Sequence, residues 1–116
     1  MIRTVDLVVA GDGSAARGAA AGALRRGDRV LVVLRSADRR VARRMRKWLR
    51  SVAPADAGQL TVMRNADVVC VDGVDGVEAV VLRHAQTGRL SAVNASAFVP
   101  FEESLGDQVR AATTRS

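Results

Sequence analysis

The sequence has 116 residues, a formal net charge of +6 and an apolar fraction of 48 %. This length allows one domain, which buries roughly two thirds of the surface of its extended chain. No apolar run approaches the roughly 20 residues of a membrane span, and the first six residues contain no basic leader, so we expect a cytoplasmic protein. The single cysteine and single histidine exclude an internal disulfide and leave no ligand set for a structural zinc.

The basic charge is concentrated in one segment. Residues 35–50 hold eight basic residues and one acid, Asp38, whereas the rest of the chain has ten basic and eleven acidic residues. A helix here could bind nucleic acid or another anionic surface. Aromatic residues make up only 3 % of the chain, which leaves little for base stacking. A solvated, arginine-rich helix face is therefore the favoured interpretation, and a nucleic-acid partner is not expected.

Apolar periodicity predicts alternating strands and helices in the first half of the chain. The expected elements are a buried strand at 3–10, a helix at 14–27, a second buried strand at 29–34, a helix capped by Ser36 or Asp38 that runs to about Val52, and a third strand at 59–64. Strands that alternate with helices in this way form a parallel sheet with right-handed crossovers.

The second half of the chain changes period. Three short strand-like runs, at 66–73, 77–85 and 90–96, are separated by glycine-containing turns and predict an antiparallel meander. Residues 97–101 are expected to return to the parallel sheet, and residues 102–116 form a C-terminal tail. The fold class is therefore α/β, with a parallel βαβαβ sheet on which an antiparallel β-meander packs.

Three single residues have ordinary structural interpretations. Cys70 falls in an apolar alternation, which favours a small buried residue over a reactive thiol. His84 ends a strand-like run, where a solvated histidine is more common than a catalytic one. Trp48 lies on the apolar stripe of the second helix and is expected in the core.

A glycine-rich turn follows the first strand and opens the first helix. Its six residues match G-x-G-x-x-A and are Gly11, Asp12, Gly13, Ser14, Ala15 and Ala16. In a dinucleotide site the first glycine permits the tight turn, the second lets the backbone approach a pyrophosphate, and the small third residue packs the helix on the strand. Backbone N–H groups and the helix dipole then face the phosphates. A glycine turn that merely joins a strand to a helix is the alternative.

The end of the second strand indicates which nucleotide would fit. An acid at this place holds the ribose hydroxyls of NAD, whereas an arginine accommodates the 2′-phosphate of NADP. Here Arg35 follows the strand, and Arg39 and Arg40 lie within one helical turn. A bidentate guanidinium suits a phosphate, so the sequence favours NADP over NAD.

From about Val5 to Pro100 the chain resembles the NADPH-binding domain of thioredoxin reductases and related pyridine nucleotide-disulfide oxidoreductases. The resemblance rests on the glycine loop, on "VLVVLRSADRR" where the family has an H-R-R-x-x-x-R signature, on the basic helix, and on "VDGVDGVEAVVLRHAQTGRL". Arg35 and Arg40 stand at the first and last arginines of the signature, while Leu34 and Ser36 replace its histidine and middle arginine. The resemblance implies a Rossmann-like NAD(P)-binding domain over residues 1–101.

This sequence also departs from the family. It has no redox C-x-x-C and no flavin-binding domain, and "FVPFEESLGD" lacks the glycine-proline segment that contacts the cofactor in the family. The favoured hypothesis is a stand-alone NADP(H)-binding module without independent catalysis, whose partner is a separately encoded flavoprotein or a second copy of the chain. The alternative is a ligand-free Rossmann-like domain that serves interaction or oligomerisation.

Overall fold

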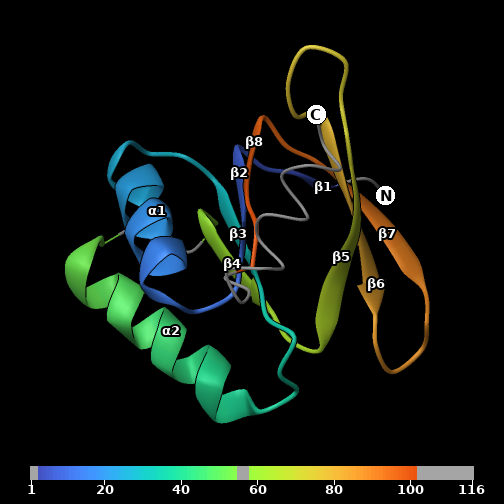
Figure 1. Cartoon of the computed structure of the whole chain (residues 1–116). Coiled ribbons are helices and arrows are strands. Elements are labelled where there is room, and N and C mark those ends of the chain that lie inside the picture. The colour runs from blue at the N-terminus through green and yellow to red at the C-terminus, as the bar shows by residue number, and fades with distance from the viewer. Residues whose placement is uncertain (1–2, 55–57, 102–116) are drawn as a thin grey trace.

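The computed structural model describes residues 3–54 and 58–101. Figure 1 shows three layers: two helices on one side, a parallel sheet in the middle and a mixed sheet on the other side. The helices are α1 (Ser14–Arg25) and α2 (Arg39–Val52). The strands are β1 (Arg3–Thr4), β2 (Leu7–Ala10), β3 (Val30–Val33), β4 (Leu60–Met63), β5 (Ala66–Asp72), β6 (Ala79–His84), β7 (Leu90–Asn94) and β8 (Ala97–Val99).

The parallel sheet has the strand order β4-β3-β2-β8. β3 pairs with β2 and with β4, and β8 lies parallel to β2 on its other side. The predicted return of residues 97–101 to the parallel sheet is therefore confirmed. Because all four strands run in one direction, their carboxyl ends meet at a single edge, where ligands bind in open α/β sheets.

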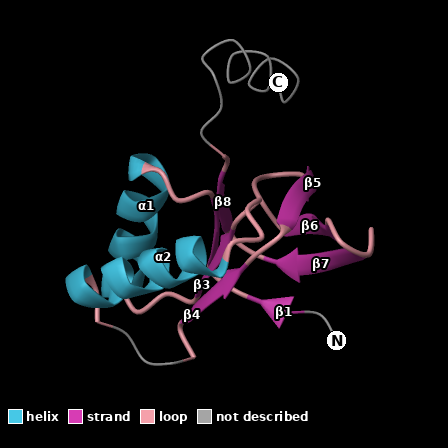
Figure 2. Cartoon of the chain, turned by 90° about the horizontal axis from the view of Figure 1, so that it is seen from below, coloured by secondary structure: helices cyan, strands magenta, loops and turns pink. Residues whose placement is uncertain are grey.

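The mixed sheet has the order β1-β7-β6-β5 and contains the predicted meander. β5, β6 and β7 are antiparallel neighbours, whereas β1 runs parallel to β7. The single strand expected at 3–10 is wrong, because the chain changes sheets at Asp6. There the Asp6 carboxylate accepts the backbone N–H of Arg29 at 2.8 Å. The backbone carbonyl of Asp6 accepts the N–H groups of Ser96 and Ala97, both at 3.2 Å. These bonds direct β1 and β2 into different sheets (Figure 2).

Glycines set the loop between β5 and β6. Gly73 has φ +157° and Gly76 has φ +132°. A Cβ atom at Gly73 would overlap the carbonyl oxygen of Gly76, so this turn requires glycine for close approach as well as for its dihedral angle. The next connection, between β6 and β7, contains Gly88 at φ +72°.

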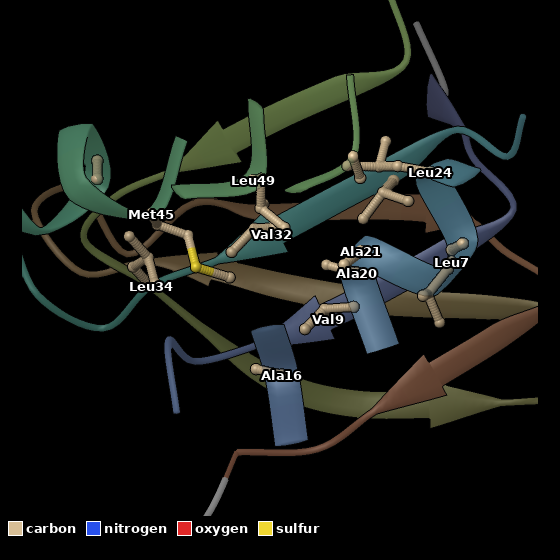
Figure 3. Packing of buried hydrophobic residues seen from close by; sticks show 14 residues of the cluster. Leu7, Val9, Ala16, Ala20, Ala21, Leu24, Val32, Leu34, Met45 and Leu49 are labelled. Atoms are coloured by element: carbon tan, nitrogen blue, oxygen red, sulfur yellow. The ribbon is translucent and has the colours of Figure 1, made fainter. Parts of the chain in front are cut away.

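Two apolar clusters lie on the opposite faces of the parallel sheet. Alternate residues of each strand serve alternate clusters, as the two-residue period of a strand requires. In β3, Val30 and Val32 join the cluster beneath the helices, whereas Leu31 and Val33 join the cluster between the two sheets. Figure 3 shows the first cluster, in which the small side chains of α1 approach the strand below them. This double burial explains why β2 and β3 are continuous apolar runs.

The helices follow the predicted periodicity closely. α1 begins at Ser14 as expected but ends at Arg25, before Gly27 at φ +84°. α2 is capped by Asp38, whose carboxylate accepts the Arg40 N–H at 2.8 Å. This bond is the main reason that the pKa of Asp38 lies below its ordinary value of 3.8. No helix in the described ranges is both long and apolar enough to cross a membrane.

The sequence predicted burial for both Trp48 and Cys70, and the structure agrees better for Trp48. Trp48 is half-buried at the rim of the helix-side cluster, with the Arg17 guanidinium 5.5 Å from its ring centroid. The expectation that Cys70 is buried is wrong, because its thiol is exposed. β5 is an edge strand with a register shift between Val68 and Cys70, which interrupts the alternation that predicted burial. The Cys70 thiol donates to a carboxylate oxygen of Asp72 at 3.1 Å, and this bond raises the pKa of the thiol.

The predicted tail at 102–116 lies outside the described residues, and so do residues 1–2 and 55–57.

Candidate functional site

The glycine loop, residues 11–13, lies between the end of β2 and the start of α1. Gly11 has φ +100°, a region that side chains rarely adopt, and its N–H donates to the Val33 carbonyl of the neighbouring strand at 2.8 Å. Gly13 is the N-cap of α1, and its carbonyl accepts the Arg17 N–H at 2.9 Å as the first bond of the helix. The loop is thus held to the carboxyl edge of the parallel sheet at Gly11 and to the first turn of α1 at Gly13.

The first turn of α1 has neither an acidic residue nor a side-chain cap, and the nearest acid along the chain is Asp12, which precedes the N-cap. The positive end of the dipole therefore faces the loop, as an anion site at a helix terminus requires. Ala16 is 1 % exposed and packs in the helix-side cluster, which is the role predicted for the third small residue of the motif. Ser14 and Ala15 are exposed at the helix start.

A hollow of about 350 Å³ opens beside the loop. We call it the loop pocket, and its lining consists of Gly11, Asp12, Gly13, Leu34, Arg35, Ser36, Val41 and Phe101. Its volume is near the lower end of the roughly 300–1,000 Å³ that is usual for ligand pockets. The glycine loop and the segment after β3 are thus brought together, as the predicted nucleotide site requires.

Arg35 lies in the loop pocket with two neighbours from distant parts of the chain. Its Nε donates to the Asp67 carboxylate at 3.2 Å, and the two side chains are 49 % and 38 % exposed. Its guanidinium carbon lies 3.9 Å from the ring centroid of Phe101. The guanidinium is therefore positioned at the pocket by an ion pair on one side and an aromatic ring on the other.

The other two predicted arginines have different surroundings. Arg39, the first residue of α2, lines a separate hollow near the β6–β7 connection. Arg40 is 81 % exposed, and its Nε lies 3.4 Å from the Asp38 carboxylate. The structure thus places Arg35 at the loop pocket and does not bring Arg39 or Arg40 into its lining.

Sequence reasoning missed two residues that shape the site. Phe101 follows β8, and its ring lies 3.5 Å from where a Cβ of Gly11 would be. Asp67 reaches Arg35 from the start of β5 and also accepts the Val68 N–H at 2.8 Å. The signal for Phe101 was available, since residues that follow parallel strands gather at one edge. No sequence spacing indicated the pairing with Asp67.

His84 ends β6 as predicted, and it is half-buried. Its Nε2 lies 3.2 Å from the hydroxyl of Ser91. Within residues 3–54 and 58–101, no group of three or more histidine, cysteine or acidic side chains could hold a metal ion.

Solved structures with a similar fold include several reductases and a halogenase. The thioredoxin reductase from Streptococcus pyogenes matches with a TM-score of 0.63 and 22 % identity, over 88 % of this chain and 32 % of that one. The bacillithiol disulfide reductase from Staphylococcus aureus matches with a TM-score of 0.61 and 15 % identity, over 87 % of this chain and 29 % of that one. A myxobacterial FAD-dependent chondrochloren halogenase matches with a TM-score of 0.65 and 15 % identity, over 89 % of this chain and 38 % of that one.

These similarities establish an α/β, Rossmann-like fold for the chain, and confirm the predicted fold class. The chain spans only about a third of the length of these structures. No protein-family model matches the sequence, and no curated protein matches it.

Proposed function

We propose that the chain is an NADP(H)-binding module whose phosphate site is the glycine loop. The observation that carries this proposal is the loop pocket. It combines a positive-φ glycine turn, the start of α1 and the guanidinium of Arg35 at the carboxyl edge of a parallel sheet. Backbone N–H groups near the loop suit a pyrophosphate, and Arg35 suits a 2′-phosphate.

The likeness to thioredoxin reductases and to an FAD-dependent halogenase supports a nucleotide ligand in general. The choice of NADP rests on Arg35 alone, because Arg39 and Arg40 do not line the loop pocket. When bound, NADPH would supply a hydride and become NADP⁺. The residues of this chain hold its phosphates, and in this proposal a separately encoded flavoprotein or a second copy of the chain uses the electrons. We assign no catalytic residue.

Titration with NADPH and NADH tests the proposal. NADPH is expected to bind more tightly than NADH, because only NADPH offers the 2′-phosphate to Arg35. Arg35→Gln should weaken NADPH binding about tenfold or more, the usual effect of losing a charge-assisted hydrogen bond, and leave NADH binding unchanged. Arg43→Gln removes an exposed arginine of α2 outside the loop pocket and is the matched control.

Gly13→Asp tests the loop itself. The added carboxylate would repel the pyrophosphate and block its approach to the backbone, so both nucleotides should lose affinity. Equal binding of NADPH and NADH by the wild-type protein would contradict the role of Arg35. An absence of binding of both nucleotides at millimolar concentration would reject the proposal.

The second candidate function is a ligand-free interaction or oligomerisation domain. The observation that favours it is the exposed edge strand β5, where Val69 is 43 % exposed beside a hollow of about 560 Å³. Such edges pair readily with other chains. Size-exclusion chromatography with light scattering tests it. A stable oligomer that forms equally in wild type and in Gly13→Asp, with no nucleotide bound by wild type, would support this candidate over the nucleotide-binding module.

A further inference from the structure

A larger hollow lies between the start of α2 and the connection from β6 to β7. It has a volume of about 910 Å³ and lies at the carboxyl end of β4. Figure 1 shows both bordering elements at the bottom of the molecule. We call it the arginine groove after its basic lining residues, which come from the start of α2, the end of β4 and the β6–β7 connection: Arg39, Arg64, His84 and Arg89.

The lining of the groove carries an excess of positive charge. None of its lining residues is acidic. Asp67 pairs with Arg35 outside the groove. Asp38 accepts from Arg40 while its charge also attracts Arg64, so Asp38 offsets part of the groove's charge. Three guanidinium groups around one hollow repel one another, and a bound anion would offset that repulsion.

The arginines differ in how firmly they are held. Arg64 Nη1 donates to the Ala37 carbonyl at 2.6 Å, which fixes its side chain at the groove wall. The side chains of Arg39 and Arg89 have no hydrogen bond or ion pair with any residue in the described ranges. The groove therefore offers one positioned guanidinium and two that remain available to a ligand.

Neutral hydrogen-bonding groups complete the lining, and these are Asn65, Gln86, Thr87 and Ser91. No aromatic side chain lines the groove, so it has no surface on which nucleic-acid bases could stack. Its volume suits a small molecule, and guanidinium forks match phosphate oxygens in geometry. The chemistry therefore favours a compact phosphorylated ligand over a polynucleotide.

We infer that the arginine groove is a second anion site, which binds a small molecule carrying two or more phosphate groups independently of the glycine loop. No residue lines both the arginine groove and the loop pocket. The inference thus goes beyond the proposed nucleotide function and does not depend on it.

Isothermal titration with inorganic pyrophosphate tests the site. The wild-type protein should bind this probe, and Arg64→Gln and Arg89→Gln should each weaken binding about tenfold or more. Arg83→Gln is the matched control, because Arg83 is exposed on β6 and does not line the groove. Thermal unfolding of each variant checks that the fold is kept. No binding by wild type, or equal binding by all three folded variants, would overturn the inference.

Independence from the glycine loop is tested with the same probe. Gly13→Asp and saturating NADPH should remove only pyrophosphate held at the glycine loop, and should leave unchanged the pyrophosphate binding that depends on Arg64 and Arg89. If NADPH displaces the pyrophosphate whose binding depends on Arg64 and Arg89, and Arg89→Gln also weakens NADPH binding, the groove belongs to the nucleotide site and a separate site is rejected. A single-stranded oligonucleotide that binds through Arg89 more tightly than pyrophosphate would reject the small-ligand class.

Discussion

Arg35 shows how one side chain can be occupied and still be suited to a ligand. Its ion pair with Asp67 is about half exposed on both sides. Such pairs contribute only about 0–1 kcal/mol, because water screens the attraction and two side chains must be ordered. A doubly charged phosphate at the loop pocket could therefore compete for the guanidinium. The contact with the Phe101 ring, 3.9 Å from the guanidinium carbon, would hold the guanidinium at the pocket when the ion pair opens.

Gly11 and Gly18 provide a matched pair of glycine substitutions. Gly11 has φ +100°, so Gly11→Ala should destabilise the fold by about 1–3 kcal/mol through backbone strain. Gly18 lies exposed inside α1, where an added methyl group meets nothing within 4 Å. Gly18→Ala should therefore stabilise the fold by about 0.5–1 kcal/mol, because alanine loses less entropy in a helix. Urea unfolding of the two variants measures both changes.

The opposite signs are the essential part of this prediction. A raised urea midpoint for Gly11→Ala would contradict the backbone strain that its dihedral angle indicates, and a lowered midpoint for Gly18→Ala would contradict the helix-propensity argument. Gly11→Ala should also weaken nucleotide binding, while Gly18→Ala should not, since Gly18 does not line the loop pocket.

At the scale of elements, local signals placed the helices better than the strands. The limits of α2 followed from a carboxylate cap at Asp38 and an apolar stripe that includes Met45 and Leu49. The strand expected at 3–10 failed because Asp6 divides it through bonds to residues that are distant in sequence. Cys70 failed for a similar reason, since neither an edge position nor a register shift is visible in a two-residue alternation.

In the candidate site, too, features that are local in sequence could be predicted and contacts between distant residues could not. The glycine loop is contiguous, so its motif and its position before α1 could be predicted from the sequence. The neighbours of Arg35 come from the start of β5 and the end of β8, and only the folded sheets bring Asp67 and Phe101 together with it. The arginine groove was not predicted at all, because its basic residues are spread over about fifty positions with no spacing that marks a site.

The cap of α2 gives a prediction that depends on pH. Asp38→Ala should lower the melting temperature by a few degrees near neutral pH, because alanine cannot accept the Arg40 N–H as the Asp38 carboxylate does. The pKa of Asp38 is depressed, so its contribution is complete above the ordinary value of 3.8 and is lost as the pH falls through the lower folded-state pKa. Thermal unfolding from neutral pH to about pH 2 measures the difference.

Asp38→Asn is the control for this prediction, because an asparagine oxygen caps a helix without titrating. The melting temperature of Asp38→Asn should be close to that of wild type at neutral pH. The asparagine cap should keep stabilising α2 in acid, where the Asp38 carboxylate is protonated. A constant difference between wild type and Asp38→Ala across the whole pH range would show that the carboxylate charge does not matter.

At the scale of the molecule, the parallel sheet joins the two apolar clusters. β3 contributes to both, with Val32 facing the helices and Leu31 facing the mixed sheet, and each is fully buried. Loss of packing on one face should therefore disturb the strands that support the other face. The helices and the meander are expected to unfold as one cooperative unit, as is usual for a domain of this size.

Trp48 allows this cooperativity to be tested, because it is the only tryptophan and lies in the helix-side cluster. Leu82 is fully buried in the other cluster, on β6. Leu82→Ala should destabilise the protein by about 2–5 kcal/mol. The midpoint of urea unfolding followed by Trp48 fluorescence should fall together with the midpoint followed by circular dichroism. Val74→Ser, at an 89 % exposed position, should change neither. If the Trp48 midpoint stayed at the wild-type value in Leu82→Ala, the meander would unfold separately from the helices and the parallel sheet.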